Sequence, residues 1–178
     1  MKIVLQQIEI EVAQGDIANQ PGIDAVVNAA NAELAPGGGV AGAIHSGAGP
    51  KLYEECRKLA PIKPGQAVIT RAYDLPNKFV IHVLGPVYGK DKPEDQYLSS
   101  CYRKAFSLAE ESKISSIAFP AISTGIFGYP PEEAVKVVFN TVLSELPNLK
   151  HLKRIKFVLF GEEDLHLYEN KLKEISVG

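Results

Sequence analysis

The sequence has little of what marks secreted, metal-binding or membrane proteins. Among 178 residues there are only two cysteines, Cys56 and Cys101, far apart and without a CxxC pair or a neighbouring pair of histidines. This spacing argues against a disulfide framework and a zinc site. We therefore expect each cysteine to fill apolar space on a helix, and we expect neither a metal nor a cofactor.

Long apolar runs are also missing. No stretch approaches the roughly 20 apolar residues that a membrane span needs. The first twelve residues, MKIVLQQIEIEV, alternate in character where a secretory signal would show a continuous apolar run. We therefore expect no membrane partner and a cytoplasmic location.

The sequence also lacks an excess of positive charge. Nineteen Lys and Arg residues against 21 Asp and Glu residues give a net charge of −2, so no general attraction to nucleic acid is expected. A basic cluster from Lys150 to Lys156 is expected to flank a strand as a solvated rim. The hydrophobic share of 46% suits an ordinary globular protein, and residues 1–178 are expected to form one domain.

Hydrophobic periodicity predicts a regular alternation of strands and helices from residue 24 onward. The expected strands are 2–13 (one long or two short), 24–28, 66–71, 78–84, 117–119 and 155–160. The expected helices are 40–49, 50–59, 94–113, 132–146 and 164–175. This order predicts an α/β fold with a mostly parallel sheet covered on both faces, and the first strand antiparallel at an edge. Ligands of such sheets bind at the carboxyl ends of strands, here after Val12, Val27, Phe119 and Phe160.

The most informative stretch is Ala25–Gly49, AVVNAANAELAPGGGVAGAIHSGAG. A buried strand runs into two carboxamides, Asn28 and Asn31, and three glycines then precede a helix of small residues. Glycines allow close approach of a ligand to the backbone, and the free N–H groups of a helix start favour a diphosphate. Carboxamides suit sugar hydroxyls. The pattern predicts a site for a phosphorylated sugar, although a glycine run before a helix is often only a turn.

A second loop of small residues follows the strand 117–119 and reads PAISTGIFGYP. It could present N–H groups to the other side of a diphosphate, as backbone nests do. Phe127 lies beside Gly128 and two residues after Gly125, and its ring could stack on a sugar or cover the site. The alternative is a loop anchored by one aromatic side chain.

NAAN followed by GGGVAGAI resembles the signature of the macro domain family, which binds ADP-ribose, and STGIFG resembles the second binding loop of that family. Both loops occur in the right order, and the resemblance covers nearly the whole chain. It implies the three-layer α/β/α macro domain fold with a mixed, mostly parallel sheet. It also implies ADP-ribose, and ADP-ribosylated proteins or small molecules, as partners.

The resemblance assigns roles residue by residue. Asp16 would accept a hydrogen bond from the adenine amino group, Ile17 would lie beside the base, and Phe160 would stack on it. Asn28 and Asn31 form the catalytic pair, with Asn31 reaching the distal ribose. The two loops that hold the diphosphate and the distal ribose comprise Gly37, Gly38, Gly39, Val40 and Ala41, and Ser123, Thr124, Gly125, Ile126, Phe127 and Gly128. Asp16 could instead simply cap the turn 17–20.

One departure concerns catalysis. The branch of the family with well-attested hydrolase activity continues the glycine run as GGGVDG, and its aspartate helps to activate water. Here Ala41 takes that position, as in archaeal-type and viral members, several of which still remove ADP-ribose from acidic side chains. The resemblance therefore implies hydrolysis of ADP-ribosyl esters or O-acetyl-ADP-ribose, with a water positioned by Asn31, the glycine loop and the substrate phosphate. The alternatives are a non-catalytic ADP-ribose reader and, less favoured by the charge, a binder of nucleic acid or poly-ADP-ribose.

Other chemistry-bearing residues are assigned to the framework. His45 is expected to be a helix histidine bonded to backbone and not a catalytic base. His82, in the strand 78–84, is expected in the core or at a sheet end. Ser123 and Thr124 have no evident His–Asp partners, so a nucleophilic triad is not supported.

Overall fold

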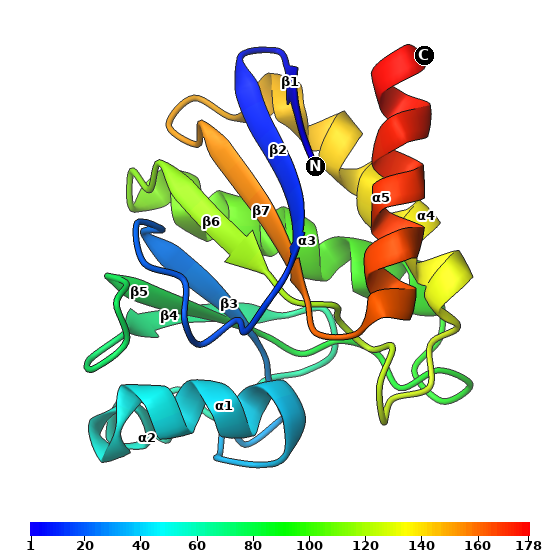
Figure 1. Ribbon diagram of the computed structural model, residues 1–178. Helices are drawn as coiled ribbons and strands as arrows, with labels where there is room; N and C mark the ends of the chain where they lie inside the picture. The colour runs from blue at the N-terminus through cyan, green and yellow to red at the C-terminus, as the bar shows by residue number, and fades with distance from the viewer.

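The computed structural model describes all residues from Met1 to Gly178 and arranges seven strands in one sheet of order β1-β2-β7-β6-β3-β5-β4 (Figure 1). The strands are β1 (Lys2–Leu5), β2 (Ile8–Gln14), β3 (Ala25–Ala29), β4 (Ala67–Arg71), β5 (Phe79–Val83), β6 (Ser116–Phe119) and β7 (Arg154–Leu159). The helices are α1 (Gly39–Ala48), α2 (Pro50–Cys56), α3 (Glu94–Glu111), α4 (Pro131–Glu145) and α5 (Glu162–Val177), with a 3₁₀ turn at Leu146–Asn148. The predicted α/β architecture is confirmed.

Five neighbouring strands, from β2 to β5, are parallel, and both edges are antiparallel. The expectation for residues 2–13 was right about an antiparallel edge, but only β1 lies there. Gln6 and Gln7 adopt positive φ angles of 49° and 67°, which turn the chain back into a hairpin. The second half of the segment, β2, pairs parallel to β7 inside the sheet.

Helices cover both faces of the sheet, which gives the three layers α/β/α (Figure 1). On one face α3, α4 and α5 pack over a core of 30 buried residues that includes Val27, Ile81 and Phe119. On the other face α1 and α2 pack over a smaller core of 16 residues that includes Val26 and Ile44. Val26 and Val27 enter opposite cores because side chains alternate along a strand. Strand β3 is therefore buried on both faces, as its apolar run predicts.

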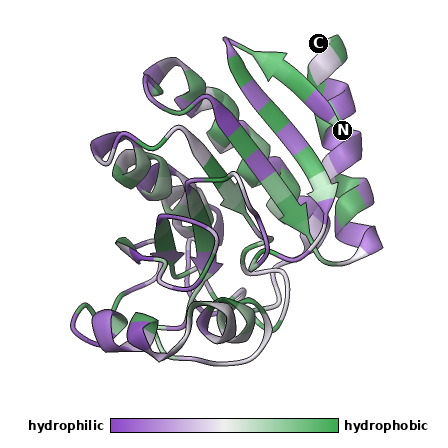
Figure 2. Ribbon diagram, turned by 60° about the vertical axis from the view of Figure 1, so that its left-hand side comes forward, coloured by the Kyte–Doolittle hydropathy of each residue, from purple (hydrophilic) through white to green (hydrophobic).

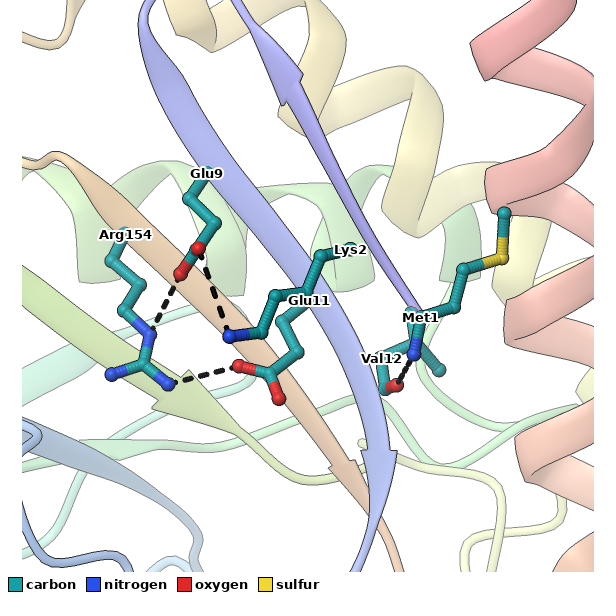
Figure 3. Close-up of polar contacts among 6 residues, drawn as sticks. All are labelled: Met1, Lys2, Glu9, Glu11, Val12 and Arg154. Atoms are coloured by element: carbon teal, nitrogen blue, oxygen red, sulfur yellow. Dashed lines mark hydrogen bonds and ion pairs between the residues drawn. The ribbon is translucent and has the colours of Figure 1, made fainter.

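The smaller helical layer leaves the outer strands of the sheet open. Purple and green segments alternate along the β1, β2 and β7 region in Figure 2, which is typical of strands with one wet face. There Arg154 Nε lies 3.0 Å from Glu9 and its Nη2 lies 2.9 Å from Glu11, while Lys2 approaches Glu9 at 3.8 Å (Figure 3). The basic cluster from Lys150 to Lys156 therefore only partly forms the expected solvated rim beside a strand, because Arg154 lies within β7. Partly exposed pairs of this kind stabilise a fold by at most about 1 kcal/mol each.

Several helix boundaries differ from the prediction, two of them for local reasons that the structure shows. Helix α5 begins at Glu162, two residues early, because three acidic residues in its first turn favour the positive end of the helix dipole. Helix α3 ends at Glu111, two residues early, because Lys113 turns left-handed with φ 54° and Ile114 N–H bonds the Ala109 carbonyl. Helix α2 also stops at Cys56 and not at residue 59. None of the helices combines the length and the apolar character needed to cross a lipid bilayer.

Candidate functional site

The predicted functional loops gather at the carboxyl ends of β3 and β6, where they enclose a cleft of about 470 Å³. The predicted residues that line it are Asn31, Gly37, Gly38, Gly39, Val40, Ala41, Ser123, Gly125, Ile126 and Phe127. The structure adds Ala29, Ala30, Gly85, Ala121 and Ile122 to this lining. Strands β3 and β6 are parallel neighbours, so their following loops meet at one edge of the sheet.

One wall of the cleft is the glycine loop and the start of α1. Gly38 is the N-cap residue, and no side chain caps this helix end or places an acid in its first turn. The first N–H groups of α1 therefore have no side-chain partner, and the positive end of the helix dipole lies behind them. Gly37 packs so closely on Gly42 that a Cβ atom on Gly42 would collide with the Gly37 carbonyl oxygen. The wall thus presents backbone N–H groups of the kind that suit an anion.

Asn31 shapes the loop that leads to the glycines. Its Nδ2 donates to the Ala35 carbonyl at 2.9 Å, and its Oδ1 accepts from the Ala35 N–H at 2.9 Å. The side chain is half-buried and lines the cleft, and its second amide hydrogen is not used in these two bonds. Asn31 can therefore hold the loop and still donate to a ligand.

The opposite wall is the loop 123–128. Ser123 adopts a left-handed φ of 66°, which is uncommon for a residue other than glycine, and its buried Oγ has no hydrogen-bond partner. A Cβ atom on Gly85 would collide with this oxygen, so only glycine fits there. The loop is held by Tyr88 N–H, which donates to the Phe127 carbonyl at 2.8 Å. Ile126 at its tip is 99% exposed.

Gly85 lines the cleft and Tyr88 holds the loop 123–128 through its backbone, and sequence reasoning missed both. Both follow β5, and their relation to the loop 123–128 arises only when β5 and β6 flank β3 in the sheet. The available signal was the carboxyl end of a buried strand, Leu84-Gly85-Pro86, which the rule for parallel sheets marks as worth inspection.

The residues predicted to hold adenine lie together but outside the cleft lining. Strands β2 and β7 are parallel neighbours, and Gly15 N–H donates to the Leu159 carbonyl at 3.0 Å, which brings Asp16 and Phe160 to the same edge. Phe160 is 91% exposed, which is unusual for a ring. Ile17 is buried in the smaller core. The structure thus groups this trio at the ends of two strands.

Asp16 also makes the local bond considered as its alternative role. Its Oδ1 accepts from the Ala18 N–H at 2.9 Å and so closes the turn. The side chain is otherwise exposed, which leaves the second carboxylate oxygen for another partner. The two roles are compatible.

The expectation that Asn28 contacts substrate does not fit its position. Its side chain is fully buried on the α1 face of the sheet and absent from the cleft lining, with Nδ2 3.0 Å from His82 Nδ1. Alternation along β3 explains this, because Asn28 shares the face of buried Val26. Thr124 and Gly128 belong to the second loop but do not line the cleft either.

Neither of the two buried histidines has the position and the pKa expected of a catalytic base. His82 lies in the core, as predicted, and burial lowers its pKa to about 3. His45 lies in α1, but the expected bond to backbone is wrong, since neither ring nitrogen has a hydrogen-bond partner. Burial lowers the pKa of His45 as well. His45 lines a separate cavity of about 370 Å³ behind the glycine loop with Tyr53 and Pro36.

The cysteines are free and buried on helices, as expected. No group of three or more His, Cys, Asp or Glu side chains is placed to hold a metal ion. The cleft itself is lined by the Asn31 carboxamide, the Ser123 hydroxyl, apolar side chains and backbone groups.

Comparison with known proteins agrees with this geometry. A sequence model of the Macro domain matches residues 27–138. An O-acetyl-ADP-ribose deacetylase of Klebsiella pneumoniae is 45% identical over 170 residues, which cover 93% of this chain and 97% of that protein. An ADP-ribose glycohydrolase, MACROD2 of Xenopus laevis, is 48% identical over 90% of this chain, which spans only 39% of that longer protein.

Solved structures extend the likeness to the whole fold. A point mutant of the Oceanobacillus iheyensis macrodomain, solved with ADPR, superposes with a TM-score of 0.94 at 36% identity and covers 100% of this chain and 99% of that one. The strand order, the two glycine-rich walls and these similarities lead to one conclusion: the chain belongs to the macro domain family.

Proposed function

We propose that this chain binds ADP-ribose in the cleft between the glycine loop and the loop 123–128. The observation that carries the proposal is the helix start at Gly38, which has no side-chain cap and faces a second loop across a cleft of about 470 Å³. Backbone N–H groups would hold the diphosphate, and Asn31 would donate to the distal ribose. The relative solved with ADPR supports this choice of ligand.

At the other end, the free oxygen of Asp16 would accept from the adenine amino group and the exposed Phe160 ring would stack on the base. The carboxyl ends of β2 and β7 lie at the same edge of the sheet as those of β6 and β3, so the ligand would extend along that edge. Residues 1–178 would act as one macro domain. The two buried free thiols support a cytoplasmic location, where thiols stay reduced.

We further propose that the chain hydrolyses ADP-ribosyl esters, either on acidic side chains or as O-acetyl-ADP-ribose. A relative covered over 97% of its length is an O-acetyl-ADP-ribose deacetylase, which supports this substrate class. Ala41 provides no carboxylate, so catalysis would depend on a water held between Asn31, the glycine loop and the substrate phosphate. Positioning of this kind can lower a barrier by about 7–11 kcal/mol when geometry is ideal.

Ala41 also favours a second candidate, a reader that binds ADP-ribose without turnover. It lines the cleft, is 5% exposed, and occupies the first turn of α1, at the position of the water-activating aspartate in the hydrolase branch. The two candidates share the binding site and differ only in chemistry.

The deciding experiment combines calorimetric titration with ADP-ribose and a release assay on a protein mono-ADP-ribosylated on glutamate. We expect one site per chain and release of ADP-ribose that Asn31→Ala reduces strongly. Asn31→Asp is a second variant: its carboxylate keeps the acceptor for Ala35 N–H but loses the bond to the Ala35 carbonyl and adds a negative charge, so it should also bind ADP-ribose more weakly. Binding without release would leave the reader function, and no binding would refute both.

A further inference from the structure

A chain of hydrogen bonds crosses three strands directly below the cleft. Asn28 in β3 and His82 in β5 are register partners, and their side chains meet with Nδ2 and Nδ1 3.0 Å apart. On the other side of the ring, His82 Nε2 lies 2.9 Å from Thr70 Oγ1 in β4. All three side chains are at least 98% buried. Cys56 Sγ also lies 3.6 Å from His82 Nε2, whereas the buried Oδ1 of Asn28 has no hydrogen-bond partner, so the bond to His82 is the one that holds the Asn28 side chain.

Thr70 indicates which atom donates in each hydrogen bond of this series. Its hydroxyl donates to the Arg71 carbonyl at 3.0 Å, and a hydroxyl has only one hydrogen. With its hydrogen on the Arg71 carbonyl, Thr70 Oγ1 can only accept from His82, and this arrangement places the ring proton on Nε2. Nδ1 is then the acceptor, and only the amide nitrogen of Asn28 can donate to it.

A neutral imidazole is essential to this arrangement. Burial lowers the pKa of His82 to about 3, and the nearby ring of His45, 6.4 Å away between centroids, acts in the same direction. A protonated Nδ1 would point its hydrogen at the hydrogens of Asn28. The ring is thus neutral while the protein is folded near neutral pH.

We propose that His82 is a positioning residue, which fixes the Asn28 amide and through it the carboxyl end of β3 that carries Asn31. The residues immediately after Asn28, Ala29 to Asn31, line the cleft. The backbone ladder between β3 and β5 runs through Asn28 and His82 to Ala29 and Val83, and just beyond it Ala30 N–H donates to the Val83 carbonyl at 2.9 Å. The effect on ligand rests on the proposed function, whereas the tautomer does not.

Two substitutions separate this role from simple packing. His82→Gln can reproduce both bonds, because its Oε1 can accept from Asn28 while its Nε2 donates to Thr70. His82→Leu fills the space with an apolar group and makes neither bond. A packing role predicts that Leu is tolerated better than Gln in this core, and the positioning role predicts the reverse order for ADP-ribose.

The experiment measures ADP-ribose affinity by calorimetry, the thermal midpoint, and the nitrogen-15 spectrum of the histidines in the ligand-free protein. We expect His82→Leu to bind about tenfold more weakly and His82→Gln to stay within about twofold of the wild type. The spectrum should show one buried neutral ring protonated on Nε2. Equal affinity for all three proteins, or better binding by Leu than by Gln, would overturn the proposal.

The spectrum keeps the two proposals distinguishable. If the wild type does not bind ADP-ribose, the proposed function fails. The observed tautomer of His82 still shows which atom donates in each hydrogen bond of the series. A ring protonated on Nδ1 would overturn the proposal even if ADP-ribose binds. Thr70→Val adds a further check, since loss of the acceptor should move the His82 signals, whereas Thr70→Ser keeps the acceptor and should leave them in place.

Discussion

Replacement of Asp16 by asparagine tests the adenine end of the site with little change to the fold. In the structure Asp16 Oδ1 accepts from the Ala18 N–H at 2.9 Å and closes the turn. In Asp16→Asn the amide oxygen must take this place to keep the turn. The amide nitrogen then occupies the position of the free carboxylate oxygen. The substitution thus converts the proposed acceptor for adenine into a donor.

The expected loss of affinity for ADP-ribose is large for the exchange of a single atom. A hydrogen bond to a charged group contributes about 1–3 kcal/mol, so ADP-ribose should bind roughly 5–150-fold more weakly. The unfolding free energy should change by less than about 0.5 kcal/mol, because the turn and its bond remain. Asp16→Ala should add the loss of the turn, about 0.5–2 kcal/mol of stability.

Calorimetry with two ligands makes the test specific. The second ligand is the hypoxanthine analogue of ADP-ribose, in which a carbonyl oxygen replaces the exocyclic amine. The wild type should prefer the adenine ligand, and Asp16→Asn should reduce or reverse that preference. If Asp16→Asn binds ADP-ribose as the wild type does, or weakens both ligands equally, Asp16 does not read the base.

Three further predictions concern the framework of the cleft. Gly42→Ala should weaken ADP-ribose binding by displacing Gly37, although alanine normally favours a helix by about 1 kcal/mol. Gly38→Ala, with open space around it, should lower the thermal midpoint only by the preference of an N-cap for glycine over alanine. Ala41→Asp should raise the rate of ester hydrolysis by about 100-fold if a general base is the missing element, and Ala41→Asn should not, as a release assay can show. Burial lowers the pKa of His82 to about 3, so the unfolded chain takes up a proton at this residue before the folded protein does. The unfolding free energy should therefore fall by up to about 1.4 kcal/mol per pH unit below about pH 6.5. Denaturant titrations from pH 6.5 to 4.5 should show a smaller dependence of this free energy on pH in His82→Gln.

Much of the fold could be predicted because its central strands are buried on both faces and its strands alternate with amphipathic helices. The N-terminal hairpin could not, since Gln6-Gln7 is not the Asn-Gly type of turn that announces a hairpin. The antiparallel pairing of β4 with β5 had a usable signal. Only seven residues separate Arg71 from Phe79, too few for the crossover that parallel strands need.

Site residues could be predicted where one loop contains them in a continuous stretch of sequence. They were harder to predict where the pairing of strands brings distant residues together. The glycine loop and residues 123–127 are contiguous in sequence, and the structure brings them together as expected. Asn28 was misassigned because spacing in NAAN does not show where the strand ends. Asn28 lies inside β3 and faces the core, whereas Asn31 lies beyond its end and faces the cleft.

The lining of the cleft contains no charged side chain, and this decides how it could select a ligand. A diphosphate there would be balanced by backbone N–H groups and the dipole of α1 alone, which act at short range and only along fixed directions. Lysines or arginines would instead attract phosphates of many shapes over about 10 Å. Because Gly37 must lie against Gly42, and Gly85 against Ser123, the positions of these N–H groups are set by close packing. Selectivity for one phosphorylated sugar therefore follows from the shape of the backbone, and that shape explains why glycines, rather than charged residues, carry the signature of the site.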